Sequence, residues 1–230
     1  MRTWLDVEST VRDELVALDG PGNRRLDACG TCGSDQVTPL YRCLECSYGI
    51  LRCSECVLKS HTELPLHRLE VCLISYLSFY AHYTQCWKDG FFDRASLNSL
   101  GYVFHLGHGG EVCPADSSPS QLTIIDANGW HKLYVRYCKC GASGVSHEHY
   151  RQLLRERWYP ASINRPKTAF TIDLLETYHK HALQGKLNLY DFYHTTMQKA
   201  DNQGRSKPLA SSFHDRSHSL LTRSPTVPLS

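Results

Sequence analysis

The 230-residue sequence has little that would place it in a membrane or draw it as a whole onto an acidic polymer. Its formal net charge at pH 7 is only +2, so nucleic-acid binding would require a local basic patch. No run is long and apolar enough to span a bilayer, and the most apolar stretch, from Val71, is short and contains serine, tyrosine and histidine. The N-terminal residues lack the apolar core of a signal peptide. We therefore expect an intracellular protein with no membrane partner.

Several patterns typical of enzymes are also missing from the sequence. It contains no glycine-rich phosphate loop and no nucleophile elbow. His147 and His149 flank Glu148, but a metalloprotease motif needs its two histidines four residues apart on one helix face. None of these patterns marks an active site, and no small-molecule substrate is evident from the sequence.

Cysteine, in contrast, is abundant, with 11 residues in the chain. Thiols stay reduced inside cells, so clustered cysteines are more typical of metal ligands than of disulfides. The segment from Cys29 to His67 contains three C-x2-C pairs followed by two histidines, and such a pair suits zinc because its short turn directs two thiolates to one point. The eight candidate ligands are Cys29, Cys32, Cys43, Cys46, Cys53, Cys56, His61 and His67.

These eight residues are enough for two tetrahedral zinc sites. Two complete sets leave no open coordination position, which a catalytic zinc needs, so we expect both ions to be structural. A redox centre is not indicated, because thioredoxin-type chemistry uses one pair at a helix start within a βαβ unit. A metal staple suits a segment with almost no apolar core of its own. Spacing alone leaves both sequential and interleaved pairing open.

A further group of candidate ligands lies beyond this segment. Cys138 and Cys140 end a predicted strand, while His108 and Cys113 lie in a glycine-rich turn after another. Together they would form a third zinc site. His105 is an alternative to His108, although packing or exposure in a strand is the simpler explanation for it. The competing interpretation of the whole group is free thiols buried at strand ends.

Hydrophobic patterning predicts the elements around these ligands. Alternating apolar residues on both sides of Asn128-Gly129 predict a hairpin, and residues 102–106 are predicted to form another strand. Four helices are predicted at 9–18, 149–157, 168–183 and 189–200. The order indicates an α+β fold in which a small zinc-stabilised module precedes a short antiparallel sheet and C-terminal helices.

The chain is expected to contain five segments. The segment at 71–87 includes Cys72 and Cys86, which have no nearby partner and are interpreted as ordinary free thiols; low order is expected there. The final segment is polar and predicted to be disordered. The five are 1–26 (helix and lead-in), 27–70 (double-zinc module), 71–87 (inserted segment), 88–200 (hairpin, third site and helices) and 201–230 (tail).

Basic residues near the predicted helix at 149–157 form a candidate nucleic-acid strip. Arg151 and Arg155 are one helical turn apart and share a face, which would suit phosphate contact. A solvated helix face, with Glu156 among the arginines, is the simpler interpretation. The strip comprises Arg151, Arg155, Arg157, Arg165 and Lys167.

Several motifs together resemble one known family. In order they are PLHRLE, FFDRASLNSLGYVFHLGH, NGWHKLYVRYCKCG, LLRERWYPASINRPKTAFT and LYDFYHTTMQKADNQG. Their order resembles the CxC-type cysteine-cluster domain found N-terminal to the Kyakuja-Dileera-Zisupton (KDZ) transposases of fungi. The resemblance extends over residues 27–215, and it implies zinc chelation, association with a mobile element and a nuclear location.

The resemblance also implies a downstream catalytic domain of RNase H-like fold. The sequence shows only what resembles the start of the next family segment, SSFHDRSHSLL, so we expect a chain that is truncated before that domain and does not cut DNA. The family also has a very short link after PLHR, where this chain has VCLISYLSFYAHYTQC. That stretch is interpreted as either a surface loop or a translated intron.

The cysteine pairs themselves resemble the B-box and ZZ cross-brace modules. In those folds the first and third pairs share one metal, and the second and fourth share the other. Carried over, one site is Cys29, Cys32, Cys53 and Cys56, and the other is Cys43, Cys46, His61 and His67. The expected function is a non-catalytic zinc module that recognises transposon-end DNA or protein partners. The alternative is a B-box/ZZ-like protein-interaction module with no nucleic-acid role.

Overall fold

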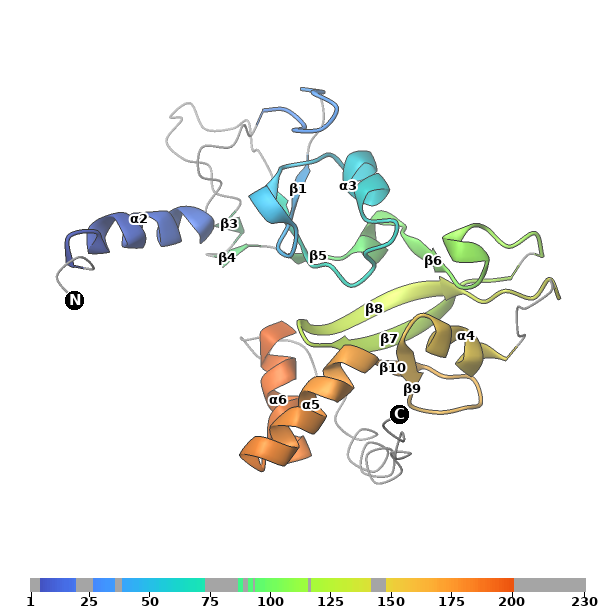
Figure 1. The fold of residues 1–230 in the computed structure, drawn as a ribbon. Helices are drawn as coiled ribbons and strands as arrows, with labels where there is room; N and C mark the ends of the chain where they lie inside the picture. Colours follow the sequence, from blue (N-terminus) through green and yellow to red (C-terminus); the bar gives the residue numbers. More distant parts are fainter. Residues whose placement is uncertain are drawn as a thin grey trace. The chain divides into compact units, whose positions relative to one another are not determined.

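A computed structural model describes residues 5–19, 27–35, 39–72, 87–88, 91–92, 94–115, 117–141 and 148–200. Nearly all of the predicted inserted segment, with Cys86, and all of the predicted tail lie outside these residues. The chain divides into two compact units, residues 1–101 and 102–230, and the bar in Figure 1 locates each along the ribbon.

The first unit begins with helix α2 (Glu8–Asp19), which confirms the helix predicted at 9–18. Its apolar residues Val11 and Leu15 are exposed. The helix therefore presents its hydrophobic side to solvent among the described residues.

The centre of the first unit is a small antiparallel sheet. Strand β2 (Leu69–Cys72) lies between β1 (Leu40–Cys43) and β5 (Arg94–Ala95). Around it are the short helix α3 (Ser54–Ser60), the 3-10 turns η1 (Ser47–Gly49) and η2 (Leu97–Leu100), and a minimal pair of strands, β3 (Trp87–Lys88) and β4 (Phe91–Phe92).

One core cluster of this unit is built largely from candidate metal ligands. Leu40 and Leu51 are packed with the buried cysteines Cys29 and Cys53, and the partly buried Cys56 packs against them. Three of these five side chains are candidate metal ligands. Packing and candidate metal ligation therefore depend on the same side chains in this cluster.

The second unit is built on a five-stranded sheet in the order β6-β8-β7-β10-β9. Its centre is the predicted hairpin, formed by β7 (Ser120–Asp126) and β8 (Gly129–Arg136). Asp126 pairs with Gly129, so the two-residue turn is Ala127-Asn128 and not Asn128-Gly129. Gly129 begins the strand with φ of 133°, a conformation that glycine adopts without strain.

The α+β prediction is confirmed, but the sheet is larger than expected and mixed. Strand β6 (Val103–His105) runs parallel to β8, and β10 (Thr168–Thr171) runs parallel to β7. The outer strand β9 (Trp158–Pro160), which was not predicted, pairs antiparallel with β10. The sheet therefore joins residues from β6 to β10 that are more than sixty positions apart in the chain.

The helix predicted at 168–183 is wrong in its first turn. Residues 168–171 are strand β10, and helix α5 (Ile172–Gly185) starts only afterwards. Thr171 ends the strand and caps the helix, since its side-chain oxygen accepts a hydrogen bond from Leu174 N. Threonine and phenylalanine favour an extended backbone once a neighbouring strand is available.

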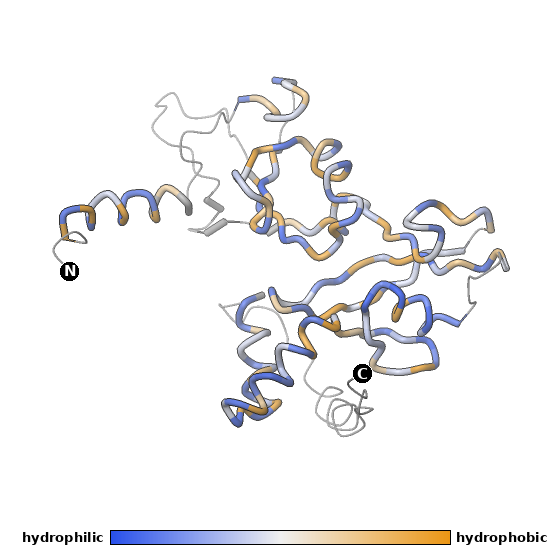
Figure 2. Tube along the Cα trace, in the orientation of Figure 1, coloured by the Kyte–Doolittle hydropathy of each residue, from blue (hydrophilic) through white to orange (hydrophobic). Residues whose placement is uncertain are grey.

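Two helical layers cover parts of the sheet. Leu122, Ile124, Leu133 and Val135 are buried on one face, and helix α4 (His149–Arg155) contacts β9 and the residues just beyond the end of β8. On the other face, Ile125 and Phe170 pack against α5 and α6 (Leu189–Ala200), which matches the helix predicted at 189–200. Hydrophobic and hydrophilic residues alternate along α5 and α6, as expected for helices with one buried side (Figure 2).

Candidate metal centres

The first set of predicted ligands, Cys29, Cys32, Cys53 and Cys56, comes together around the start of helix α3. The four sulfur atoms lie within 4.8 Å of one another. Cys53 is the N-cap of α3, and Cys56 follows in its first turn. Cys53 N donates to Cys29 Sγ at 3.3 Å, and Cys56 N donates to Cys53 Sγ at 3.5 Å. Backbone N–H groups thus surround sulfur atoms that must be thiolates to bind a metal.

The pKa values in this set show how the thiols are coupled. Burial raises the pKa of Cys29, but hydrogen bonds from the backbone of Cys32, Cys53 and Thr31 outweigh it and lower the pKa to about 6. The pKa of Cys56 is raised to about 12, first through its hydrogen bond with Cys53. The low pKa of Cys29 and the high pKa of Cys56 mean that both can be thiolates at neutral pH only if a nearby cation stabilises the second charge.

The second set, Cys43, Cys46, His61 and His67, also brings its ligand atoms within 4.8 Å of one another. His67 Nδ1 lies 3.3 Å from Cys43 Sγ and 3.4 Å from Cys46 Sγ. His61 Nε2 lies 3.5 Å from Cys46 Sγ. The two histidines therefore face the sulfur atoms through different ring nitrogens.

His61 is fixed in its ligand form by its surroundings. Its Nδ1 lies 2.8 Å from the carbonyl oxygen of Val57, which can only accept, so Nδ1 carries the hydrogen and donates. Nε2 is then free of hydrogen and available to a metal. The side chain is 0% exposed, and burial lowers its pKa, which favours the neutral ring that a metal requires.

An ion pair beside the second set links two of the segments that supply its ligands. Glu45 lies between Cys43 and Cys46, and its carboxylate accepts a hydrogen bond from Arg68 N at 2.7 Å and pairs with the Arg68 guanidinium. Arg68 directly follows His67. The pair therefore ties the cysteine turn to the segment that supplies the last histidine.

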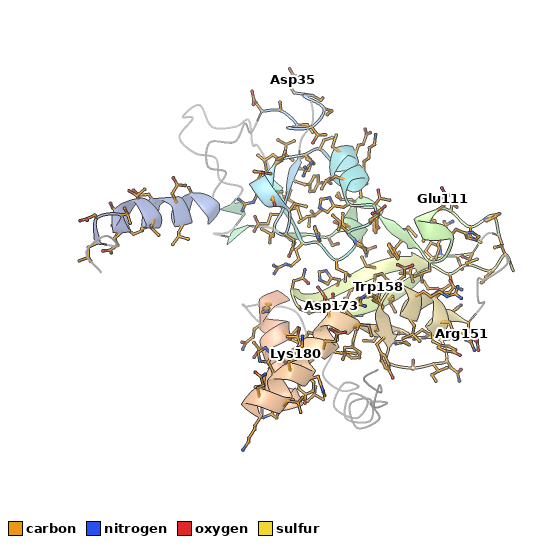
Figure 3. The ribbon with its side chains drawn as sticks, in the orientation of Figure 1. Asp35, Glu111, Arg151, Trp158, Asp173 and Lys180 are labelled. Atoms are coloured by element: carbon orange, nitrogen blue, oxygen red, sulfur yellow. The ribbon has the colours of Figure 1, made fainter. Side chains whose placement is uncertain are left out.

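The third set, His108, Cys113, Cys138 and Cys140, lies in the second unit and is equally compact, within 4.8 Å. His108 Nε2 is 3.1 Å from Cys140 Sγ and 3.2 Å from Cys138 Sγ, and Cys113 Sγ is 3.5 Å from Cys138 Sγ. Figure 3 labels Glu111, which lies in the turn between His108 and Cys113.

His105, the alternative to His108, is not part of the third set. It lies on β6 in register with Arg136 of β8. Burial and the charge of Arg136 lower its pKa. His108 joins the third set because of the glycine-rich turn. Gly107 and Gly109 both have positive φ, which directs the chain so that His108 lies beside the cysteines.

All three sets have the chemistry of closed tetrahedral metal sites. They offer four sulfurs, two sulfurs with two nitrogens, and three sulfurs with one nitrogen. Each set has the four ligands that a structural site needs, so none keeps a protein-free coordination position. The chain can therefore bind metal ions through cysteine and histidine clusters, and the first two sets interleave along the sequence.

Comparison with known families identifies part of the chain. Residues 97–204 match the family described as "CxC2 like cysteine cluster associated with KDZ transposases". This part of the chain is similar to that CxC2 family. The resemblance to KDZ-associated cysteine clusters is thus confirmed for residues 97–204, a narrower range than 27–215. No curated protein and no solved structure matches the chain significantly.

The CxC2 segment contains the third set, the five-stranded sheet and helices α4 to α6. The first two sets precede it along the sequence. Within the described residues, no helix is both long and apolar enough to cross a lipid bilayer.

Gln152 is a residue of the CxC2 segment that the sequence patterns did not single out. It lies on α4 and is only 2% exposed. Its Oε1 accepts a hydrogen bond from Cys138 N at 2.9 Å, and its Nε2 donates to Cys138 O at 3.0 Å. One side chain thus satisfies both backbone groups of a metal ligand. The sequence signal that could have indicated this role is a glutamine next to Leu153, on the buried side of the helix.

A stacked ring pair supports the same contact. The rings of Tyr137 and His149 are 3.8 Å apart and only 9° from parallel. Burial, together with the charges of Lys139 and Arg165, lowers the pKa of His149. The neutral imidazole therefore stacks on the residue that precedes Cys138, so α4 holds this strand end at two points.

The predicted nucleic-acid strip does not form a continuous patch of unpaired cations. Arg151 pairs with Glu148, and Arg157 pairs with Asp173 at 2.7 Å. Arg151 and Asp173 are labelled in Figure 3. The other three members, Arg155, Arg165 and Lys167, are exposed. Two of the five charges are therefore already partly balanced within the protein.

Proposed function

We propose that the chain is a non-catalytic zinc-binding module that recognises DNA for a KDZ-transposase-like element in the nucleus. The observation that supports this proposal best is the presence of three complete four-ligand sets. Thiolate and imidazole ligands in tetrahedral sets are characteristic of structural zinc. Zinc accepts different proportions of sulfur and nitrogen ligands, as the three sets offer.

Each ion would join distant parts of the chain. The first two would connect segments around β1 and α3, and the third would connect the turn after β6 to the end of β8. Zinc binding of this kind contributes directly to folding free energy. The metals would therefore shape a recognition surface and take no part in a reaction.

DNA is the proposed ligand because the CxC2 cluster is associated with transposases, whose substrate is DNA. The interleaved first two sets support a second candidate function, a B-box/ZZ-like module for protein interaction. DNA binding separates the two candidates, since the second has no nucleic-acid role.

The decisive test measures metal content and DNA binding on the same preparation. Native mass spectrometry should find three zinc ions per chain, one for each ligand set. If the wild type binds two zinc ions and the Cys138→Ser variant also binds two, the third set is not a zinc site. If the wild type binds no zinc ion, the proposal is contradicted.

The zinc-loaded chain should then bind fluorescently labelled DNA with an affinity that falls as salt rises, because phosphate contacts release counterions. No binding even at low salt would remove the DNA role and favour the protein-interaction module. Cleavage of the DNA with Mg²⁺ present would contradict the non-catalytic assignment.

A further inference from the structure

One half of a sheet face in the second unit combines an exposed aromatic ring with cations. Lys132, Tyr134 and Arg136 alternate along β8 and so project from the same face. Strand β8 lies between β6 and β7, so these residues are not on a sheet edge. Tyr134 is nevertheless 41% exposed, which is unusual for a large aromatic side chain on an interior strand.

The pairing registers extend this surface to the neighbouring strands. Tyr134 lies opposite Gln121 of β7 and Val103 of β6, and Arg136 lies opposite His105. Gln121 is exposed. We call this half of the sheet face, made of Val103, His105, Gln121, Lys132, Tyr134 and Arg136, the β8 face.

The core contacts of helices α5 and α6 lie on the other half of this sheet face. Their core contacts involve Ile125, Trp130 and Phe170, which lie towards the turn of the hairpin. Lys199 on α6 donates a hydrogen bond from Nζ to Ala127 O at 3.0 Å, which holds that helix at the turn. The contacts of both helices are therefore concentrated at the opposite end from Tyr134.

The charge of the β8 face has one sign. Lys132 is exposed and its Nζ lies 5.4 Å from the centre of the Trp130 ring, while Arg136 adds a second positive charge. Asp126 is the only acidic residue in strands β6, β8, β7 and β10. It belongs to the opposite face and accepts a hydrogen bond from the Thr171 hydroxyl at 2.6 Å. Among the described residues of these strands, none of the carboxylates belongs to the β8 face.

We propose that the β8 face binds single-stranded DNA, with a base stacked on Tyr134 and phosphates at Lys132 and Arg136. A flat sheet face cannot enter a duplex groove, but it can support unpaired bases on an aromatic ring while neighbouring cations follow the backbone. Alternate residues on a strand are roughly 6.8 Å apart, so both cations flank the ring closely. This inference rests on the proposed function, since it names where and in what form DNA binds.

The test uses the full zinc-loaded chain with a labelled 15-nucleotide single strand of mixed sequence and a hairpin duplex of the same sequence. Tyr134→Ala should weaken single-strand binding about tenfold or more, because the stacking of one base is removed. Tyr134→Phe should bind nearly as the wild type does. Tyr190→Ala is the matched control, since Tyr190 is 59% exposed but lies on α6.

Charge is tested by a second pair of variants. Lys132→Glu should weaken single-strand binding and reduce the slope of log affinity against log salt by about 0.7 for each phosphate that is no longer neutralised. Lys180→Glu changes the net charge equally but lies on α5, where Figure 3 labels it, and should have a much smaller effect. Zinc content and circular dichroism should be unchanged in every variant.

The outcomes separate this inference from the proposed function. If the wild type binds single strands but Tyr134→Ala and Lys132→Glu behave like their controls, the β8 face is not the binding site, although the chain still binds DNA. Binding to the duplex but not to the single strand would likewise contradict the β8 face and leave the proposed DNA binding intact. If the wild type binds neither DNA, both proposals fail. Photocrosslinking of a bromouracil-containing strand to Tyr134, mapped by mass spectrometry, would support the face directly.

Discussion

At the scale of single residues, the second and third candidate metal sites depend on residues that are not ligands. Val57 sets the tautomer of His61 through its carbonyl oxygen, and Glu45 holds Arg68 beside His67. Partners of this kind orient the ligands and raise their affinity for the metal. They extend these sites beyond their four ligands.

Gln152 offers the sharpest test at this scale. Replacing it with leucine keeps the volume but leaves Cys138 N and O without their partner in the interior. We expect Gln152→Leu to weaken zinc binding at the third set by about 10- to 100-fold. Competition with a chromophoric chelator would measure it.

Leu153→Val is the matched control, because Leu153 is adjacent on α4 and fully buried but has no hydrogen bond to Cys138. It should lower stability slightly and leave the zinc affinity of the third set nearly intact. Equal reductions of zinc affinity in both variants would show that Gln152 acts only through packing.

His149 predicts a pH dependence. Its folded pKa lies below the ordinary value of about 6.5, because of burial and then Lys139 and Arg165. Between the folded pKa and about 6.5 the unfolded chain therefore binds more protons, so stability falls as the pH falls through this window. His149→Phe keeps the ring stack on Tyr137 but cannot be protonated.

Urea unfolding at pH 7.5, 6.5 and 5.5 would measure this contribution. The wild type should lose more stability on acidification than His149→Phe, and the difference between the two proteins removes the shared effect of protonating metal ligands. Parallel curves for both proteins would show that His149 makes no contribution.

At the scale of elements, a single threonine joins strand β10 to helix α5. The Thr171 side-chain oxygen accepts from Leu174 N at 3.3 Å, and its hydroxyl donates to Asp126 at 2.6 Å. It thus caps the helix and ties it to β7. Thr171→Val should lower the free energy of unfolding by about 1–2 kcal/mol.

Thr177→Val provides the comparison for this prediction. Thr177 lies on the same helix and donates to Asp173 O at 2.7 Å, but it is exposed. Its replacement should cost about 0.5 kcal/mol or less. Chemical denaturation of the two variants would be compared, and an equal cost would contradict a special role for the junction.

The same junction shows where sequence patterns fail at this scale. Residues 168–171 continue smoothly into the apolar pattern of α5, so periodicity alone extends the helix too far. Pairing with β7, more than forty residues earlier, decides that they are a strand. Strand β9 was missed for the same reason, because its pairing with β10 is not visible locally.

At the scale of the whole molecule, the two units differ in what stabilises them. The described first unit has a short three-stranded sheet and a core cluster made largely of candidate ligands, whereas the second has a five-stranded sheet with many buried apolar side chains. Removing zinc with a strong chelator should therefore unfold residues 29–67 more completely than β7 and β8. The reason is that a sheet with its own apolar core survives removal of a staple.

Hydrogen exchange would measure this difference. After chelation, amides of β1 and α3 should exchange almost as in an unfolded chain, while those of β7 and β8 should stay protected. Adding zinc back should restore protection. Equal loss of protection in both units would show that all three metals stabilise one cooperative structure.

Much of the candidate site was accessible from sequence because C-x2-C pairs constrain geometry locally. All twelve predicted ligands lie in the three sets. The contacts that fix them, such as Gln152 with Cys138, join residues from different elements and depend on how α4 packs. Local patterns carry no information about such packing, which explains why the sequence predicted the members of the three sets but not the residues that support them.

The interleaved order of the first two sets has a consequence for synthesis on the ribosome. The first set receives its last ligand at Cys56 and the second at His67, only eleven residues later. At about 5–20 residues per second, the two sets are completed within roughly two seconds of each other. Before Cys56 is made, the nascent chain carries five thiols of the two sets and neither set is complete. The supply of zinc during this short interval would therefore affect both sites nearly at once.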